Sequence, residues 1–284
     1  MKVSVIIPAY NEEAVIGDCL LSSGKQTFKD LEVVIVDDGS SDKTLSILSE
    51  FKIRNLEFRI LKQDHKGAGV ARNLGAKEAK GEILVFVDAD MVFDRFFIEK
   101  LTEPIIQGKG IGTFSREEYV LNKDNVWSKC WNINKGLPAN RMHPENYPDE
   151  QPVFRAILRK EFQKVGGFTA IGYIDDHTLS EKLGVMAKVA PGAVFFHLNP
   201  ASLGEIYHQA RWIGKSEFKR RKVKDENLMR LLAMIRYSLP LSIINGAYKA
   251  IIFGSPQFLI FKIVYDLAVE VSLIRSFFAE QKYR

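Results

Sequence analysis

Short apolar runs alternate with amphipathic stretches along the first hundred residues. The apolar runs cover residues 3–7, 31–36, 57–61 and 83–87. The stretches between them have apolar residues at helical spacing, as at Val15, Ile16, Cys19 and Leu20. Strands that alternate with helices are joined by right-handed crossovers and form a parallel sheet. The pattern therefore predicts an α/β fold with a mostly parallel sheet flanked by helices.

Acidic residues follow two of these predicted strands directly. Asp37 and Asp38 come after the second, and Asp88-Ala89-Asp90 comes after the fourth. Ligands bind beyond the carboxyl ends of strands in open α/β sheets. Mg²⁺ or Mn²⁺ accepts one or two carboxylates and completes its coordination with phosphate oxygens and water. An isolated Asp-x-Asp favours a solvated turn over a metal site, and the rest of the chain reverses that preference.

The segment around Gly67 and Gly69 is neither a P-loop nor a dinucleotide-binding motif. No Gly-Lys-Ser/Thr follows the glycines, and Arg72 stands where the dinucleotide motif has its third glycine. The simplest interpretation of these glycines is a flexible loop. Arg72 lies in the first turn of the helix predicted from residue 70, where it can reach a diphosphate.

Beyond residue 90 the pattern is less regular. It predicts a helix over 96–106, a strand over 111–121, an irregular segment over 122–149, a strand over 153–159 and a helix over 160–165. Trp127 and Trp131 have two interpretations: they stack on sugars from a long loop, or they form the buried face of a helix.

Four segments in order resemble family 2 glycosyltransferases with the GT-A fold. They are Val3-Ser-Val-Ile-Ile-Pro-Ala-Tyr-Asn-Glu12, Val34-Ile-Val-Asp-Asp-Gly-Ser-Ser-Asp42, Gly69-Val-Ala-Arg-Asn-Leu-Gly75 and Val87-Asp-Ala-Asp90. The resemblance implies that Pro8, Ala9, Tyr10 and Glu12 contact the nucleoside of a nucleotide-sugar donor, and that Asp38 bonds to its base. It also implies that Asp88 binds the ribose or a metal, that Ala89 lines the donor site, and that Asp90 is the main ligand of Mn²⁺ or Mg²⁺.

Three later positions resemble further parts of this family. Asp175 and Asp176 follow Gly166-Gly167-Phe168 and resemble the acidic motif of the acceptor side, which makes Asp176 the candidate general base and Asp175 an acceptor contact. An acidic helix start is the alternative interpretation of this pair.

His197 ends an apolar run, either as a third metal ligand, which favours Mn²⁺, or as a strand-edge histidine. Residues 207–214 resemble the Gln-x-x-Arg-Trp segment, with His208 in place of Gln. There Arg211 offsets diphosphate charge and Trp212 stacks on the acceptor.

Composition indicates a reducing compartment and a basic surface. The chain has 284 residues, an ordinary apolar content and a net charge of +5, which excludes wholesale disorder. Cys19 and Cys130 lack metal-ligand spacing and predict reduced, buried thiols. The basic residues cluster at Arg211, Lys215, Lys219, Arg220, Arg221, Lys222 and Lys224. Such a cluster before an apolar tail favours the cytoplasmic face of an anionic membrane.

The tail itself has three interpretations. Residues 237–260 contain a single charge, Lys249, and the following stretch carries Lys262, Asp266 and Glu270 on one stripe. A membrane hairpin, helices lying flat on a membrane and a soluble helical cap all fit. We favour membrane association.

These observations predict three regions: a GT-A catalytic domain over 1–203, a basic interface segment over 204–227 and a hydrophobic helical region over 228–284. The predicted function is an inverting, metal-dependent transfer of a hexose from a UDP- or GDP-sugar to a glycan or lipid-linked acceptor. The alternative is a non-catalytic nucleotide-sugar-binding scaffold at the membrane. No nucleic-acid partner is expected.

Overall fold

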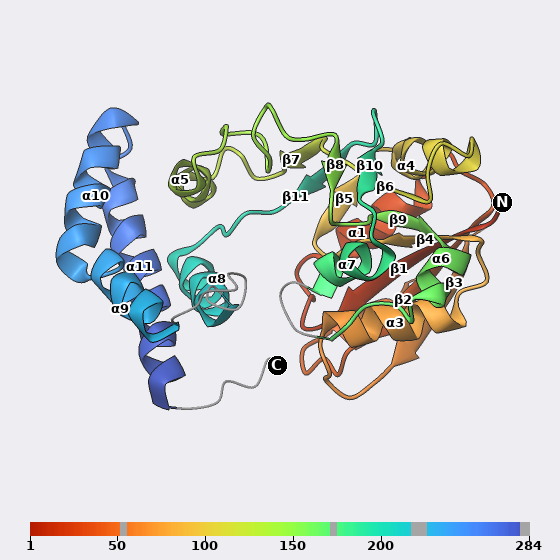
Figure 1. Ribbon diagram of the computed structural model, residues 1–284, viewed down its shortest axis with the longest axis horizontal. Helices are drawn as coiled ribbons and strands as arrows, with labels where there is room; N and C mark the ends of the chain where they lie inside the picture. The colour runs from red at the N-terminus through yellow and green to blue at the C-terminus, as the bar shows by residue number, and fades with distance from the viewer. Residues whose placement is uncertain (52–55, 171–174, 217–225, 279–284) are drawn as a thin grey trace. The chain divides into compact units, whose positions relative to one another are not determined.

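The structure, a computed structural model, describes residues 1–51, 56–170, 175–216 and 226–278. The chain divides into two compact units (Figure 1). The first contains Met1–Tyr119 and Glu145–His197, and the second contains Val120–Pro144 and Leu198–Lys282.

The first unit is built on an eight-stranded sheet in the order β3-β2-β1-β4-β9-β6-β10-β8. Its strands are β1 (Val3–Ala9), β2 (Leu31–Asp37), β3 (Glu57–Lys62), β4 (Ile83–Phe86), β6 (Gly112–Phe114), β8 (Glu150–Gln151), β9 (Ala156–Leu158) and β10 (Ala187–Val189). Strands β1 to β4 pair in parallel, as do β6 and β10, whereas β9 runs antiparallel to β4 and β6. This arrangement confirms the predicted α/β class and mostly parallel sheet.

Helices cover both faces of this sheet. They are α1 (Ile16–Gly24), α2 (Thr44–Glu50), α3 (Ala68–Glu78), α4 (Phe97–Ile106), α6 (Arg159–Lys164) and α7 (Thr178–Leu183), which follows the short 3-10 helix η1 (Asp175–His177). Alternate residues of a strand face opposite sides, so Val85 packs with α1, α2 and α4 while Leu84 and Phe86 pack with α3, α6 and α7. Gly75 lets α3 lie close to β1, because a Cβ there would meet Ile6 Cγ2 at 2.6 Å.

A second, three-stranded sheet has the order β5-β11-β7. Its strands are β5 (Met91–Phe93), β7 (Glu118–Val120) and β11 (Phe195–His197). The central strand β11 pairs antiparallel with β5, which places His197 opposite Met91. This small sheet therefore joins the residue after Asp90 to the strand that ends in His197.

Two sequence-based predictions are wrong in this region. The predicted single strand over 111–121 is two strands, β6 and β7, which belong to different sheets. The segment 122–149 is not irregular throughout, because it contains the helix α5 (Val126–Lys135). Asn125 caps that helix by accepting hydrogen bonds from the backbone N–H groups of Trp127 and Ser128.

The second unit is helical. Besides α5 it contains α8 (Leu203–Ser216), α9 (Glu226–Arg236), α10 (Leu239–Ile252) and α11 (Gln257–Phe278). Trp131 is fully buried and packs edge-on against Phe261 and Tyr265 of α11, so the helix interpretation of the two tryptophans is the correct one. Asn199 Nδ2 donates to Asn132 Oδ1 at 2.9 Å and ties the chain after β11 to α5.

The charged stripe of the tail is internal to this helical unit. Asp266 is buried and accepts hydrogen bonds from Lys262 at 2.7 Å and from Ser242 at 2.6 Å. Among the helices in the described ranges, none combines the length and the apolar character that a membrane crossing requires. Most of the predicted basic cluster, from Lys219 to Lys224, lies outside the described residues.

Candidate functional site

The carboxyl ends of β1, β2 and β4 meet at one edge of the large sheet. Ala9 pairs with Asp37 in register, and the backbone N–H of Asp38 donates to the carbonyl of Ala9 at 2.8 Å. Pro8 and Ala9 therefore end β1 beside the loop that carries Asp38. Asp88, Ala89 and Asp90 follow β4, the strand on the other side of β1. The parallel topology thus gathers most of the predicted donor residues at one edge.

The Asp38 carboxylate is buried and organises the loop before α3. It accepts hydrogen bonds from the backbone N–H groups of Lys66 at 2.8 Å and Gly67 at 2.9 Å, and from the Gln63 side chain at 2.6 Å. Gly67 has a φ of 94°, a left-handed conformation that favours glycine. Gly67 thus lies in a turn held by Asp38, and Gly69 lies in the first turn of α3, where the sequence predicted a flexible loop. The contact of Asp38 with a base stays a prediction.

Tyr10 and His65 form an aromatic pair beside this loop. Their rings stack with centroids 3.9 Å apart and an angle of 22° between their planes, and the Tyr10 side chain is exposed. Asn11, with a φ of 56°, accepts a hydrogen bond from the Ser41 N–H at 2.8 Å. The segment after β1 is therefore pinned to the segment after β2, and it presents an aromatic surface at the sheet edge.

Glu12 lies among the acidic groups of this edge. Burial and the negative charges of Asp90 and Asp88 raise the pKa of Glu12 to about 8. The backbone N–H of Glu12 donates to Thr44 Oγ1 at 2.7 Å, which fixes its position in the loop. At neutral pH this carboxyl is therefore mostly protonated, and it can donate a hydrogen bond to a ligand.

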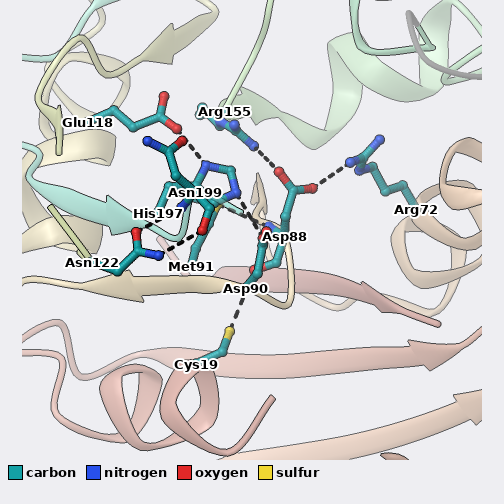
Figure 2. Close-up of polar contacts among 10 residues, drawn as sticks. All are labelled: Cys19, Arg72, Asp88, Asp90, Met91, Glu118, Asn122, Arg155, His197 and Asn199. Atoms are coloured by element: carbon teal, nitrogen blue, oxygen red, sulfur yellow. Dashed lines mark hydrogen bonds and ion pairs between the residues drawn. The ribbon is translucent and has the colours of Figure 1, made fainter. Parts of the chain in front are cut away.

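Two arginines hold the Asp88 carboxylate from either side (Figure 2). Arg72 Nη2 lies 2.6 Å from Oδ1, and Arg155 Nη1 lies 3.1 Å from Oδ2. Burial alone would raise the pKa of Asp88, but the charges of Arg155 and Arg72 outweigh it and keep the pKa well below its usual range. Below, the Asp88 carbonyl faces the buried thiol of Cys19 at 3.7 Å. Asp88 is consequently a fixed, ionised group.

Asp90 is bonded to His197. Asp90 Oδ1 lies 2.9 Å from His197 Nε2, and Glu118 Oε1 lies 2.6 Å from His197 Nδ1 (Figure 2). Burial opposes a charge on the imidazole, but the carboxylates of Asp90 and Glu118 outweigh it and hold the pKa of His197 well above its ordinary value. The structure thus brings together Asp90 and His197, which the sequence separates by more than a hundred residues.

The donor set of Asp90 and His197 fits a divalent cation. Within the described ranges, no three or more His, Cys, Asp or Glu side chains are already arranged as a metal site. A carboxylate and an imidazole are nevertheless adjacent, and a cation in a nucleotide site takes its other ligands from phosphate oxygens and water. The oxygen and nitrogen pair suits Mn²⁺. Asp88, the third predicted ligand, has both carboxylate oxygens on arginines.

The acidic pair at 175–176 is divided between two environments. Asp175 is buried, and its carboxylate lies so close to Gly69 in the first turn of α3 that a Cβ there would fall 2.2 Å from Oδ2. Asp176 is the more exposed of the two, with 38% of its side chain accessible. Burial raises the pKa of Tyr147, and the charges of Glu118 and Asp176 raise it further. The charge of Asp176 therefore acts on the same phenol as the charge of Glu118, and it also acts on the Arg155 guanidinium.

Thr178 replaces the last carboxylate of the acidic motif and holds the turn. Its hydroxyl donates to the Asp175 carbonyl at 2.5 Å and accepts the Thr169 N–H at 3.0 Å.

The remaining two predicted residues, Arg211 and Trp212, lie on α8 in the second unit. Trp212 is 47% exposed and the Arg211 guanidinium lies over the Tyr207 ring. Their roles toward donor and acceptor stay predictions.

Residues 4–166 match the sequence profile of Glycosyl transferase family 2. The chain belongs to this family. A poly(ribitol-phosphate) beta-glucosyltransferase of Bacillus spizizenii is 40% identical over 206 residues, which cover 66% of this chain and 30% of that protein. The family resemblance noted in the sequence is thereby confirmed.

Solved structures of other glycosyltransferases confirm the GT-A fold. The mannosyltransferase PcManGT of Pyrobaculum calidifontis, solved with GDP-Man and Mn²⁺, superposes with a TM-score of 0.59 at 21% identity, over 97% of this chain and 87% of that one. S. aureus TarS 1-349 with UDP gives 0.56 at 18% identity, over 100% and 93%. The curated relatives are longer: the chain spans about a third or less of the length of the first ones it matches.

Three residues at this sheet edge were not predicted from the sequence. They are Glu118, Arg155 and His65, which lie in segments without a recognisable motif. Arg155 is the single charged residue within the apolar run 153–158, and this is the local signal that could have pointed to it. Glu118 lies in β7, which the sequence pattern did not separate from β6. The direction of its side chain therefore could not be predicted.

Proposed function

We propose that this chain transfers a hexose from a UDP- or GDP-sugar to a hydroxyl of a glycan or lipid-linked acceptor, with inversion at the anomeric carbon. The observation that carries the proposal is the cluster at one sheet edge: ionised Asp88 between two arginines, Asp90 on His197, and Asp176 nearby. Similar proteins support this proposal: TarS was solved with UDP and PcManGT with GDP-Man, and the Bacillus spizizenii relative is a poly(ribitol-phosphate) beta-glucosyltransferase.

The chemistry follows from the charges of this edge. Asp90 and His197 would hold a divalent cation, which would supply positive charge against the leaving diphosphate. Arg72 and Arg155 keep Asp88 ionised and in place for a ribose hydroxyl or the cation. Tyr10, stacked on His65, supplies an aromatic wall for the nucleoside.

Asp176 is the proposed general base. It accepts the proton of the acceptor hydroxyl while the new bond forms at the anomeric carbon and the bond from that carbon to the diphosphate breaks. Attack from the face opposite the diphosphate inverts the configuration. Asp175, buried against α3, fixes the turn that presents Asp176.

Substitution of Asp176 tests the proposal. Asp176→Asn should lower turnover by about 10²- to 10⁴-fold while the Kd for UDP or GDP in the presence of Mn²⁺ is unchanged. The matched control is Glu181→Gln, which makes the same charge change on the exposed face of α7. Unchanged turnover in Asp176→Asn would remove this residue from the mechanism. Retention of configuration in the product, measured by NMR, would exclude the inverting reaction.

We also propose that the second unit binds the cytoplasmic face of an anionic membrane. The solvent-facing side of α10 is mostly apolar, with Ile244 62% exposed, Tyr248 63% and Ile251 82%. The sequence before α9 is rich in Lys and Arg, the complement of anionic lipid. A helix with such a face fits one that lies flat in the membrane interface.

Vesicle sedimentation tests this surface. The chain should sediment with phosphatidylcholine vesicles that contain phosphatidylglycerol, and less with phosphatidylcholine alone. The double variant Ile244→Gln/Ile251→Gln should lose sedimentation, whereas Leu21→Gln, an exposed leucine of α1 in the first unit, should not. Equal sedimentation of the double variant would refute the proposal. A concentration-dependent dimer lost in that variant would assign the surface to a second copy.

A further inference from the structure

Glu118 contacts the imidazole that lies on Asp90. Its side chain is 8% exposed, and Oε1 lies 2.6 Å from His197 Nδ1. The other ring nitrogen, Nε2, lies 2.9 Å from Asp90 Oδ1. A carboxylate accepts hydrogen bonds only, so both ring nitrogens carry a proton in these contacts (Figure 2). The two nitrogens differ in the exposure of their partners, because the Asp90 side chain is 36% exposed and the Glu118 side chain is buried. A cation would therefore displace the proton on Nε2.

The backbone makes this arrangement rigid. His197 ends the central strand β11 of the three-stranded sheet, Glu118 begins the neighbouring strand β7, and Asp90 directly precedes β5 on the other side. The Phe195 N–H donates to the Glu117 carbonyl at 3.1 Å, which locks the strands next to Glu118. Side chains placed by strands keep their position better than those placed by loops.

We infer that Glu118 is a positioning residue for the divalent cation. By accepting the Nδ1–H hydrogen bond, it fixes the orientation of the ring, so that Nε2 presents its lone pair beside Asp90 once a cation displaces the Nε2 proton. This inference rests on the proposed function, because it concerns the cation that Asp90 and His197 would share. It assigns Glu118 an effect through His197, with no contact of its own to donor or acceptor.

Metal affinity is the readout that separates this role from a structural one. Mn²⁺ is titrated into the full chain at saturating UDP or GDP, and free Mn²⁺ is measured by electron paramagnetic resonance. Glu118→Met, which keeps the volume and removes the acceptor, should weaken Mn²⁺ binding about 10- to 100-fold. Glu118→Gln, whose amide oxygen still accepts the Nδ1 proton, should lose less. The Kd of the nucleotide in EDTA should not change.

Two further variants make the test specific. Glu117→Gln is the matched control: its carboxylate accepts the Gly192 N–H at 2.9 Å, and its Mn²⁺ affinity should equal that of the unaltered chain. In a His197→Ala background, Glu118→Met should cause no additional loss, because the residue that Glu118 positions is gone. Circular dichroism checks that each variant is folded.

The outcomes distinguish this inference from the proposed function. Weak Mn²⁺ binding in His197→Ala with normal binding in both Glu118 variants would overturn the inference alone. An additional loss from Glu118→Met in the His197→Ala background would also overturn it, because Glu118 would then act directly. Absence of Mn²⁺ binding in the unaltered chain, or full affinity in His197→Ala, would refute the proposed metal site and the inference with it.

Discussion

Replacement of Glu12 by glutamine should make the first unit more stable in alkaline solution and leave its stability unchanged in acid. Glu12 is partly buried, and its pKa is about 8 instead of 4.5 because of burial and the charges of Asp90 and Asp88. The folded chain keeps this proton above pH 4.5, whereas the unfolded chain releases it. The unfolded state therefore binds fewer protons between pH 4.5 and 8, and the free energy of unfolding falls as pH rises through this window.

The size of the effect follows from the displacement of the pKa. Each unit by which the pKa of Glu12 is raised corresponds to about 1.4 kcal/mol of unfolding free energy. The rise in the pKa from 4.5 to about 8 therefore sets an upper limit of about 5 kcal/mol on the change in stability. Solvent screens a partly exposed carboxyl, so we expect about 2–3 kcal/mol. The glutamine side chain of the variant does not titrate. The stability difference between Glu12→Gln and the unaltered chain should thus grow by this amount between pH 4.5 and 8.5.

Chemical unfolding in EDTA, followed by circular dichroism, measures this difference. All three tryptophans lie in the second unit, so their fluorescence does not report on Glu12. Glu13→Gln serves as the control, because Glu13 is exposed and its carboxylate accepts the Lys43 N–H at 2.9 Å. A stability difference that stays constant with pH, or one that appears equally in the control, would refute the explanation given for Glu12.

Other substitutions test other parts of the structure. Arg155→Met leaves Asp88 with one arginine, and should lower the free energy of unfolding at pH 7 by about 1–3 kcal/mol, with a smaller loss at pH 3, measured by chemical unfolding. Gly69→Ala forces the buried Asp175 carboxylate to move, so turnover should fall at least tenfold while the circular dichroism spectrum is retained; normal turnover would contradict the packing described here. Trp131→Ala should destabilise the second unit by about 3–5 kcal/mol, seen as a lower thermal midpoint, whereas a solvent-facing tryptophan would cost little.

The sequence was most informative where strands end. The acidic residues after Val36 and after Val87 predicted the sheet edge that gathers the site, because parallel topology brings those ends together without knowledge of side-chain packing. The same rule placed Asp90, whereas His197, which ends a strand of the small sheet, was a candidate through the family resemblance. Their 2.9 Å contact depends on the pairing of β5 with β11, which no local pattern determines.

Predictions failed where the chain leaves the main sheet. Periodicity alone does not separate a continuous strand over 111–121 from two short strands in different sheets, and this error hid Glu118. The segment 122–149 is rich in Asn and Pro, which favours loops. The burial of Trp131 and Cys130 against α11 nevertheless stabilises a helix there. In both cases tertiary packing overrides the local preference.

The buried thiol of Cys19 offers a native reporter of the catalytic edge. Its sulfur has no exposed surface, and burial together with the charges of Asp90 and Asp88 raises the pKa of the thiol far above the ordinary value. While α1 is packed on the sheet, the sulfur is inaccessible and protonated, so alkylating reagents do not react with it. The rate at which iodoacetamide labels this position measures how often α1 separates from Asp88, and a bound nucleotide sugar should slow that labelling.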